Sequence, residues 1–524
     1  MHVHSINMTA LIFLLVVSIH GDPNVESSSH TMDNILDFYD EANNDGLNII
    51  WAHAVNSKAS MEEACNDDTM MLETDIILRG IGTENQTNIP VHAHPPDTDS
   101  DITLVEWLDR ITQEPNKGMK LDFKYIEAVE PSMVIIKEKE SQIHVPLWVN
   151  ADIVKGPNSP KDPIPPRVFI DSCNKYFPLT TMSLGFTTYW NATATEDLYT
   201  WQMIFDNIQY TYPLKQPVTF PIRAIWCLRS WDKFTWLMGL KDDFSITVWS
   251  GANDVVDVTG LINLRYYRDS KRIYYDLPDP LMAEFKQALE DGIVQPPPRM
   301  QMWNVDLWEP ILSRFEGDFV FLSTEGVGIM GGQSAMNYAG CVQSIDQMKP
   351  SQKMIITGTV QFVNKYETNS GETTLEIAFR TTGLWSSSGS GVTDGILASI
   401  SNNGKITLYD MNSEKEATLS LPEAECYQFE VTDDVENATC RIKVEIVRCS
   451  DAKSAPPNAG EMLDVSLKDV PDLDQYEKFH VAFGKLGNSK DIVVEDFYVE
   501  GGAGLARWSY VLLFVLAVLS RVFI

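Results

Sequence analysis

The sequence predicts a TIM-type (β/α) barrel followed by an all-β sandwich of jelly-roll type. Between residues 48 and 251, short apolar runs alternate with amphipathic segments, which is the pattern of βα units around a parallel sheet. After residue 308 the pattern changes to alternating polar and apolar residues between Gly, Asn and Asp turns, as in antiparallel strands. The length of 524 residues agrees with two domains, because one hydrophobic core rarely serves so long a chain.

The barrel domain is expected over residues 35–294. An open doubly wound sheet is the competing architecture, but the turn at 54–57 after the first strand lacks the glycines of a dinucleotide site. The predicted strands are 49–55, 70–78, 119–124, 145–152, 179–186, 218–226 and 246–249. The predicted helices are 104–111 (with Thr103 as N-cap), 131–139, 167–176, 196–208, 231–240 and 280–290.

A stiff linker is expected at residues 295–307, where three prolines follow one another. The sandwich then covers residues 308–500, and its predicted strands follow the period-two pattern. These strands are 319–322, 355–363, 374–380, 395–399, 426–431, 441–447 and 479–483.

Both ends of the chain are apolar. Residues 1–21 are predicted to be a cleaved signal peptide, because a short apolar run precedes a polar stretch. Residues 501–524 are predicted to be either a GPI-anchor signal, since small residues precede an apolar tail, or a transmembrane tail. Sequons at Asn85, Asn191 and Asn437 are candidate glycosylation sites. Together these features predict a glycoprotein in the extracellular space, attached to the outer face of the plasma membrane.

Seven cysteines divide between the two domains. The barrel contains Cys65, Cys173 and Cys227. The odd barrel cysteine is expected to be buried and inert. The even set in the sandwich predicts two disulfides in an oxidising compartment, with three connectivities open. That set is Cys341, Cys426, Cys440 and Cys449.

The charge distribution argues against nucleic acid as a partner. The chain has 73 Asp and Glu against 40 Lys and Arg, for a net charge of -33. No segment combines basic residues with aromatic ones, as a groove that follows a phosphate backbone requires.

Charged residues stand inside the otherwise apolar predicted barrel strands. Glu73 and Asp75 are two residues apart, as are Asp122 and Lys124, so each pair projects to one side of its strand. Unpaired charges are almost never fully buried, so carboxylates that face the barrel interior need a partner. A divalent cation suits three oxygen ligands, with Mg²⁺ favoured over Ca²⁺. The alternative is a structural ion-pair network.

Further residues complete the candidate site. His53 and a second histidine can act as general base and general acid on a phosphoester, and Lys124 can neutralise charge on the phosphoryl oxygens. Trp148 and Asn150 end the next strand and are predicted to line the substrate pocket, although a core role suits Trp148 equally. Weaker candidates near later strand ends are Arg223, Trp226 and Trp249.

Five segments of the barrel carry a family resemblance. They are Ile50-Trp-Ala-His-Ala-Val-Asn-Ser57, Leu72-Glu-Thr-Asp75, Ala93-His-Pro-Pro96, Gly118-Met-Lys-Leu-Asp-Phe-Lys124 and Trp148-Val-Asn-Ala-Asp152. Together they resemble the menorin family, whose barrel is similar to the glycerophosphodiester phosphodiesterase and spider sphingomyelinase D group of TIM-barrel enzymes. The resemblance implies a first-strand histidine, three metal carboxylates and a lysine. These correspond to His53, to Glu73, Asp75 and Asp122, and to Lys124.

The resemblance also bears on the second histidine. His94 matches the His-Pro-Pro pattern of menorins and is favoured as the second proton carrier. His92 is the alternative, because it lies two residues away on the same face of an extended segment. The enzyme group commonly follows its first histidine with Arg-Gly, whereas Ala54 and Val55 follow here.

Two hypotheses for function follow. The first is a metal-dependent phosphodiesterase at the cell surface that hydrolyses or cyclises glycerophospho- or lysophospho-diesters. The second is a non-catalytic adhesion or interaction factor in neuronal or epithelial morphogenesis, in which barrel and sandwich bind surface receptors or glycans. The second rests on the resemblance to menorins, which are extracellular factors implicated in shaping neurons.

Overall fold

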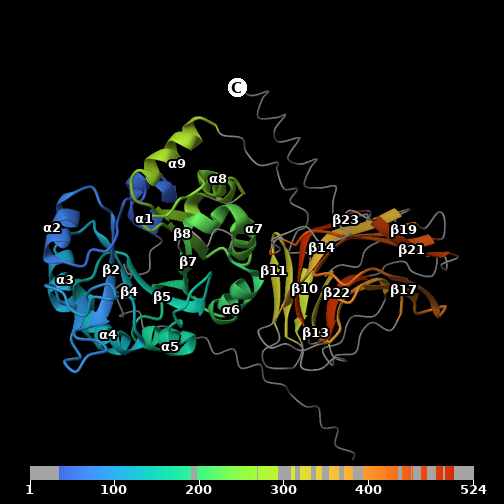
Figure 1. Cartoon of the computed structure of the whole chain (residues 1–524), viewed down its shortest axis with the longest axis horizontal. Helices are drawn as coiled ribbons and strands as arrows, with labels where there is room; N and C mark the ends of the chain where they lie inside the picture. The colour runs from blue at the N-terminus through green and yellow to red at the C-terminus, as the bar shows by residue number, and fades with distance from the viewer. Residues whose placement is uncertain are drawn as a thin grey trace, which may run out of the picture.

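The computed structural model contains a barrel and a sandwich that lie side by side (Figure 1). It describes residues 35–190, 198–267, 270–292, 308–312, 319–331, 338–344, 353–364, 371–381, 394–434, 439–449, 451, 462–468, 480–487 and 490–500. The predicted signal peptide, the predicted linker and the predicted C-terminal signal or tail lie outside the described residues.

Eight parallel strands form the barrel sheet in the order β1-β2-β4-β5-β6-β7-β8-β9, and β3 pairs antiparallel with β2. The strands are β1 (Trp51–Ala52), β2 (Met71–Leu78), β3 (Pro90–His92), β4 (Gly118–Phe123), β5 (Leu147–Lys155), β6 (Thr181–Thr187), β7 (Val218–Arg223), β8 (Phe244–Trp249) and β9 (Ile273–Asp276). The helices are α1 (Ile35–Phe38), α2 (Lys58–Asn66), α3 (Leu104–Ile111), α4 (Val129–Glu138), α5 (Pro166–Tyr176), α6 (Trp201–Thr211), α7 (Cys227–Met238), α8 (Val258–Tyr267) and α9 (Leu281–Glu290). This alternation confirms the predicted α/β barrel architecture.

The barrel is nearly closed at the seam between its first and last strands. The sequence-based prediction omits β9, which is only four residues long. In the described part of the chain, β9 and the two-residue β1 share no hydrogen-bonded ladder. Side chains bridge the seam instead, because His53 Nδ1 lies 2.9 Å from Asp276 Oδ2.

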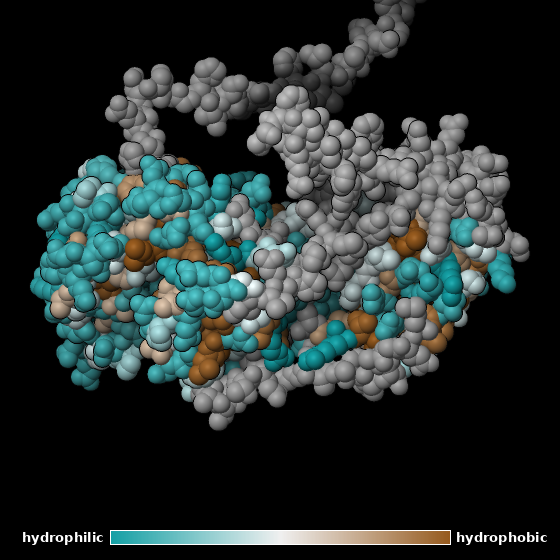
Figure 2. All heavy atoms as spheres, turned by 90° about the horizontal axis from the view of Figure 1, so that it is seen from above, coloured by the Kyte–Doolittle hydropathy of each residue, from teal (hydrophilic) through white to brown (hydrophobic). Residues whose placement is uncertain are grey.

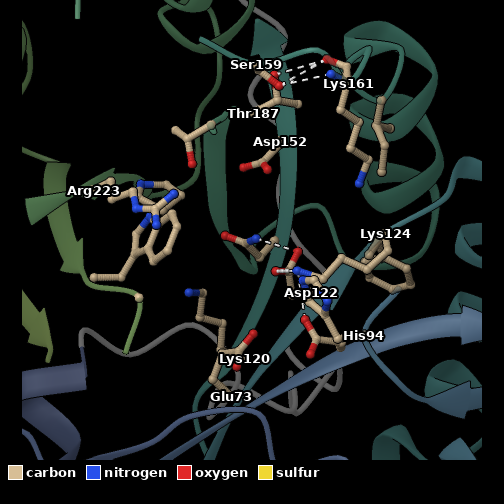
Figure 3. Close-up of a pocket in the computed structure, with 18 of the residues that line it drawn as sticks. Glu73, His94, Lys120, Asp122, Lys124, Asp152, Ser159, Lys161, Thr187 and Arg223 are labelled. Atoms are coloured by element: carbon tan, nitrogen blue, oxygen red, sulfur yellow. Dashed lines mark hydrogen bonds and ion pairs between the residues drawn. The ribbon is translucent and has the colours of Figure 1, made fainter. Parts of the chain in front are cut away.

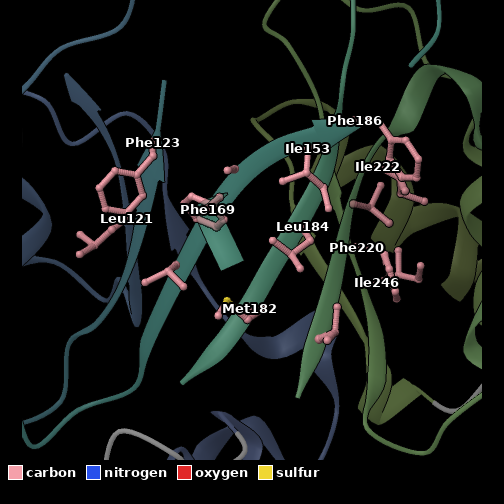
Figure 4. Close-up of a cluster of buried hydrophobic side chains, with 14 of the residues drawn as sticks. Leu121, Phe123, Ile153, Phe169, Met182, Leu184, Phe186, Phe220, Ile222 and Ile246 are labelled. Atoms are coloured by element: carbon pink, nitrogen blue, oxygen red, sulfur yellow. The ribbon is translucent and has the colours of Figure 1, made fainter. Parts of the chain in front are cut away.

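Alternate residues of the barrel strands point outward into the core beneath the helices (Figure 4). On β7, Phe220 and Ile222 are fully buried there. The ring of Phe123 on β4 lies 5.8 Å from the ring of Phe169 on α5. The intervening residues point inward, so the polar side chains near the carboxyl ends of the strands face the barrel interior.

Helix α3 begins where the sequence predicts, at Thr103. The Thr103 hydroxyl accepts a hydrogen bond from the backbone N–H of Glu106, and the Glu106 carboxylate accepts one from the backbone N–H of Thr103 at 2.9 Å. This capping box satisfies two backbone donors that the first helical turn would leave free.

The second domain consists of two antiparallel sheets, which confirms the predicted β-sandwich. Sheet B has the order β10-β13-β22-β15-β16-β17-β18 and sheet C the order β11-β12-β23-β14-β19-β20-β21. The first seven strands are β10 (Trp308–Leu312), β11 (Phe319–Ser323), β12 (Gly326–Met330), β13 (Tyr338–Ser344), β14 (Lys353–Asn364), β15 (Thr373–Thr381) and β16 (Ile396–Ser401). The others are β17 (Lys405–Asp410), β18 (Lys415–Ser420), β19 (Cys426–Asp434), β20 (Thr439–Ile446), β21 (Met462–Lys468), β22 (His480–Gly487) and β23 (Lys490–Glu500).

The sandwich contains one disulfide, between Cys426 and Cys449, and the expectation of a second one is wrong for the described residues. Cys341 and Cys440 are both free and buried. Cys440 on β20 lies in the core between the sheets, whereas Cys341 on β13 packs in a separate small cluster. They belong to different sheets and different clusters, and no bond joins them. The three barrel cysteines are free and buried.

The barrel and the sandwich share a hydrophobic contact. Phe321 on β11 is fully buried, and its ring lies 6.2 Å from that of Phe205 on α6 and 5.3 Å from that of Tyr212. The buried Lys233 ammonium on α7 pairs with Asp451 at 2.8 Å. Figure 1 accordingly shows β11 next to α6 and α7. Apolar packing and a buried ion pair therefore hold the two domains together.

The surface of the barrel is mostly hydrophilic in the view of Figure 2, in keeping with the net charge of -33. Among the described residues, no helix is long and apolar enough to cross a membrane.

We expect Phe321→Ala to lower the free energy of unfolding by about 3–5 kcal/mol, because it opens a cavity in the shared core. Calorimetry of the full chain would measure the change. Leu228→Ala is the matched control, since Leu228 is an exposed residue of α7. A melting curve identical to that of the unmodified protein would contradict the shared core.

Candidate functional site

A cavity of about 460 Å³ opens at the carboxyl ends of the barrel strands (Figure 3). His53 follows β1, Lys124 follows β4, and Arg223 and Trp249 are the last residues of β7 and β8. In parallel (β/α) barrels this end carries the functional residues, because the loops that follow the strands gather there.

The register of the central strands sets the depth of each side chain. Asp75 on β2, Asp122 on β4 and Asn150 on β5 are neighbours across the sheet. Glu73 and Lys120 are likewise neighbours, two residues earlier on the same strands. Because i and i+2 share a face, all five side chains point into the barrel in two successive layers.

Three carboxylates form the centre of the site. Glu73, Asp75 and Asp122 each offer an oxygen atom within 4.8 Å of the others. Glu73 and Asp75 are buried. Burial raises the pKa of Glu73 to about 7, with the charge of Asp75 adding to the rise and that of His53 opposing it. Buried hard oxygen ligands that repel one another fit a divalent cation such as Mg²⁺ or Ca²⁺.

Lys124 bridges two of the three carboxylates. Its ammonium lies 2.7 Å from Asp75 Oδ1 and 2.5 Å from Asp122 Oδ2. Burial opposes the charged form of Asp75, yet Lys124 brings the pKa of Asp75 down to about 2. Burial likewise opposes the charge of Lys124, but Asp122 and Asp75 hold its pKa well above the usual range. Asp75 and Lys124 are therefore both charged at neutral pH.

Amides orient the remaining carboxylate oxygens. Asn150 Nδ2 donates to Asp122 Oδ1 at 2.7 Å, and Ser183 Oγ donates to Asn150 Oδ1 at 2.5 Å. On the other side, Asn56 Nδ2 donates to Asp75 Oδ2 at 2.6 Å. Such donors fix how each carboxylate presents its second lone pair to the cavity.

His53 lies against the third carboxylate. Its Nδ1 is 3.4 Å from Glu73 Oε2 and 2.9 Å from Asp276 Oδ2. The charge of Glu73 raises the pKa of His53 to about 10, against burial, and Asp276 adds to this rise. The backbone N–H of Ala54 also donates to Glu73 Oε2, at 2.9 Å, although Ala54 adopts a φ of 56°. His53 is therefore a protonated imidazolium in the cation-free site.

The two candidate histidines of the next segment lie in different environments. His94 is exposed and lines the cavity. Its Nδ1 is 2.6 Å from the Pro95 carbonyl oxygen, which only accepts, so Nδ1 carries the proton and Nε2 can take one. His92 is fully buried against the ring of Trp107, and burial lowers its pKa to about 3. His92 is not among the residues that line the cavity.

Of the other predicted residues, some line the cavity and some do not. Trp148 is buried between Trp51 and Tyr274, below the cavity. Arg223 lines the cavity, stacks 5.1 Å from the centre of the Trp249 ring and pairs with Asp254. Trp226 and Asn85 do not line the cavity. Trp226 is buried beside Arg223, Asn85 is exposed in the turn between β2 and β3, and Asn191 and Asn437 lie outside the described residues.

The sequence prediction omits several polar residues of the site, among them Asp276, Lys120, Asp152 and Asn56. Asp276 could have been found, since it ends a short apolar run, as the predicted carboxylates do. Lys120 and Asp152 stand two residues from Asp122 and Asn150 and share their inward face. Burial and the charge of Asp122 raise the pKa of Asp152 to about 7. Asn56 gives no signal in the sequence, because it lies in a loop.

Comparison with known families covers both domains. A model of the menorin N-terminal domain matches residues 45–282, and a model of the menorin C-terminal domain matches residues 317–499. The chain belongs to the menorin family. The N-terminal match contains every residue of the site, from His53 to Asp276. The site is thus part of the menorin N-terminal domain.

Known relatives and structures extend this comparison. Protein FAM151B of Homo sapiens is 40% identical over 245 residues, which are 47% of this chain and 88% of that protein. The VIP36 exoplasmic/lumenal domain, in its Ca²⁺/Man3GlcNAc-bound form, is 10% identical with a TM-score of 0.27, covering 39% of this chain and 87% of that one. The legume lectin-like domain from Entamoeba histolytica is 10% identical with a TM-score of 0.27, and the match covers 40% of this chain and 99% of that one. Structural similarity this low does not bear on function.

We expect Asp122→Asn to weaken binding of Mg²⁺ or Ca²⁺ by at least about tenfold, because it removes a charged oxygen ligand. Isothermal titration calorimetry would measure the affinity. Asp162→Asn is the matched control, since Asp162 lies at the cavity rim with its side chain 96% exposed. Equal cation affinities for the unmodified protein, Asp122→Asn and Asp162→Asn would favour a purely structural ion-pair network.

In cation-free protein, we expect NMR titration to find the His53 pKa near 10. This value lies above the unfolded value of about 6.5, so the stability from the His53 contacts is complete below that pH and is lost as the pH rises through about 10. Asp276→Asn should lower the His53 pKa. A bound cation should lower it too, because it offsets the charge of Glu73. A His53 pKa near the unfolded value of about 6.5 would contradict the contact between His53 and Asp276 across the seam.

Proposed function

We propose that this cavity binds a divalent cation and cleaves phosphodiesters of the glycerophospho or lysophospho class. The observation that supports this most strongly is the carboxylate cluster of Glu73, Asp75 and Asp122 with Lys124 bound to two of its members. A bound cation would supply Lewis acidity toward a phosphoryl oxygen. Lys124 uses two N–H donors on carboxylates and keeps the third for the same phosphoryl group.

The two histidines supply the proton transfers. His94 Nε2 takes the proton from the attacking oxygen, which belongs to water or to a neighbouring hydroxyl of the substrate. The new P–O bond forms as the P–O bond to the leaving group breaks. His53, held as an imidazolium by Glu73 and Asp276, gives a proton to the leaving oxygen. Water attack yields a phosphomonoester and an alcohol, and hydroxyl attack yields a cyclic phosphate and an alcohol.

The proposed setting is outside the cell. The Cys426–Cys449 disulfide is typical of an oxidising compartment. The apolar segments at residues 1–21 and 501–524 and the exposed sequon at Asn85 agree with export and with attachment to a membrane.

The test is the release of choline or ethanolamine from glycerophospho- and lysophospho-diesters in the presence of Mg²⁺. We expect His94→Asn to lower kcat by about 10²- to 10⁴-fold, since it removes the general base. Asp122→Asn should also abolish turnover, and Asp162→Asn should not. Equal rates for the unmodified protein and Asp122→Asn would overturn the proposal, because they would show a reaction without the carboxylate cluster.

A further inference from the structure

The Lys120 side chain differs from every other cation at the cavity. It is only 4% exposed, yet its ammonium forms no hydrogen bond or ion pair with the residues that the structure describes. Its ammonium lies 5.9 Å from the centre of the Trp51 ring. Lys120 lines the cavity, and Figure 3 shows its side chain extending from beside Glu73 into the open space.

A buried ammonium without a partner is unfavourable, because burial removes water and nothing replaces it. The other lysines placed inside this domain have partners within the chain, and Lys117 donates to the backbone carbonyls of Asp67 and Thr69. Lys124 has Asp75 and Asp122, and Lys233 has Asp451. Lys120 instead keeps its three N–H donors for the cavity. A charge in this condition indicates a group that arrives from outside the chain.

The position of Lys120 defines where that group would lie. Glu73 is its neighbour across the sheet, and Asp122 is two residues ahead on the same strand. Lys120 leans toward Trp51 on β1, whereas Lys124 sits between Asp75 and Asp122. In Figure 3 the two lysines approach the carboxylate cluster from opposite sides. A group held over the cluster would therefore meet one ammonium on each side.

We propose that Lys120 is a substrate-binding residue that donates to an anionic phosphoryl oxygen on the His53 side of the cavity, opposite Lys124. This inference rests on the proposed phosphodiester chemistry and narrows it, because the phosphoryl group is held between two lysines. A diester phosphate offers two non-bridging oxygens that share one negative charge. One faces Lys124 and the other faces Lys120. Such charge-assisted hydrogen bonds are stronger than neutral ones.

The competing explanation is that Lys120 only offsets the charges of Glu73 and Asp276 from a distance. The two explanations agree that Lys120→Met tightens cation binding, since a positive charge leaves the neighbourhood of Glu73. The two explanations differ in the phosphate affinity that they predict for Lys120→Met. A binding residue loses phosphate affinity on this change, whereas a remote counter-charge leaves it nearly unaltered.

The experiment measures inorganic phosphate binding to the full chain by calorimetry, with and without saturating Mg²⁺. We expect Lys120→Met to weaken phosphate binding by about tenfold to a hundredfold, as for loss of a hydrogen bond to a charged group. The same variant should bind Mg²⁺ at least as tightly as the unmodified protein, which shows that it is folded. The control is Lys161→Met, at an exposed lysine of the cavity rim, with an expected loss of less than about threefold.

Further arms use glycerophosphocholine and micelles of lysophosphatidylcholine in place of phosphate. A similar loss for all three ligands supports a contact with the phosphoryl group itself. A loss confined to the micelles would overturn the inference, since it would place Lys120 against the lipid. Unchanged phosphate binding in Lys120→Met, or no phosphate binding by the unmodified protein, would also overturn it.

Turnover separates this inference from the proposed function. Phosphate binding that depends on Lys120 in a protein without turnover would support the contact and overturn the reaction. Turnover with phosphate binding that does not depend on Lys120 would support the reaction and overturn the contact.

Discussion

Three carboxylates within 4.8 Å of one another inside a barrel repel each other, and the rest of the site offsets that repulsion. Lys124 lies against Asp75 and Asp122, and an imidazolium lies against Glu73. These partners come from different strands or from the residues that directly follow them. The site therefore depends on the parallel register of β2 and β4, which sets Asp75 beside Asp122. A shift of one residue in either strand would turn its carboxylates into the apolar core.

The same constraint explains how the barrel closes. The two-residue β1 pairs with β2 but has no ladder with β9 among the described residues, and the charged pair of His53 and Asp276 bridges the seam. Ala54 takes a left-handed conformation that costs roughly 1–2 kcal/mol for a residue with a Cβ. Its N–H donates to Glu73 in return, which helps to satisfy a buried carboxylate. Closure of the barrel and the charge of the cavity are thus coupled at one seam.

The sequence reveals the site residues that interrupt apolar strands, because a charge inside a buried strand needs a partner. Period-two spacing cannot separate His92 from His94, since it places both on one face, and only the resemblance to menorins favours His94. The structure separates them because β3 ends at His92, and beyond that residue the alternation no longer holds. Asp276 is missed because its four-residue strand is too short for a periodic signal, although the apolar run before it marks its position. The single disulfide escapes it because sequence parity says nothing about which sheet a cysteine joins.

The positively charged side chains inside the cavity are of two kinds, and the partners of each side chain distinguish them. The Arg223 guanidinium meets both oxygens of Asp254 at 2.7 Å, and Lys124 meets two carboxylates, so both side chains are held by the protein itself. Their charge is largely offset before any ligand arrives. Lys120 is as deeply buried but keeps its donors for the cavity. A protein that needed only charge balance at Glu73 would place this ammonium in contact with it, and the separation points instead to a ligand that lies between them.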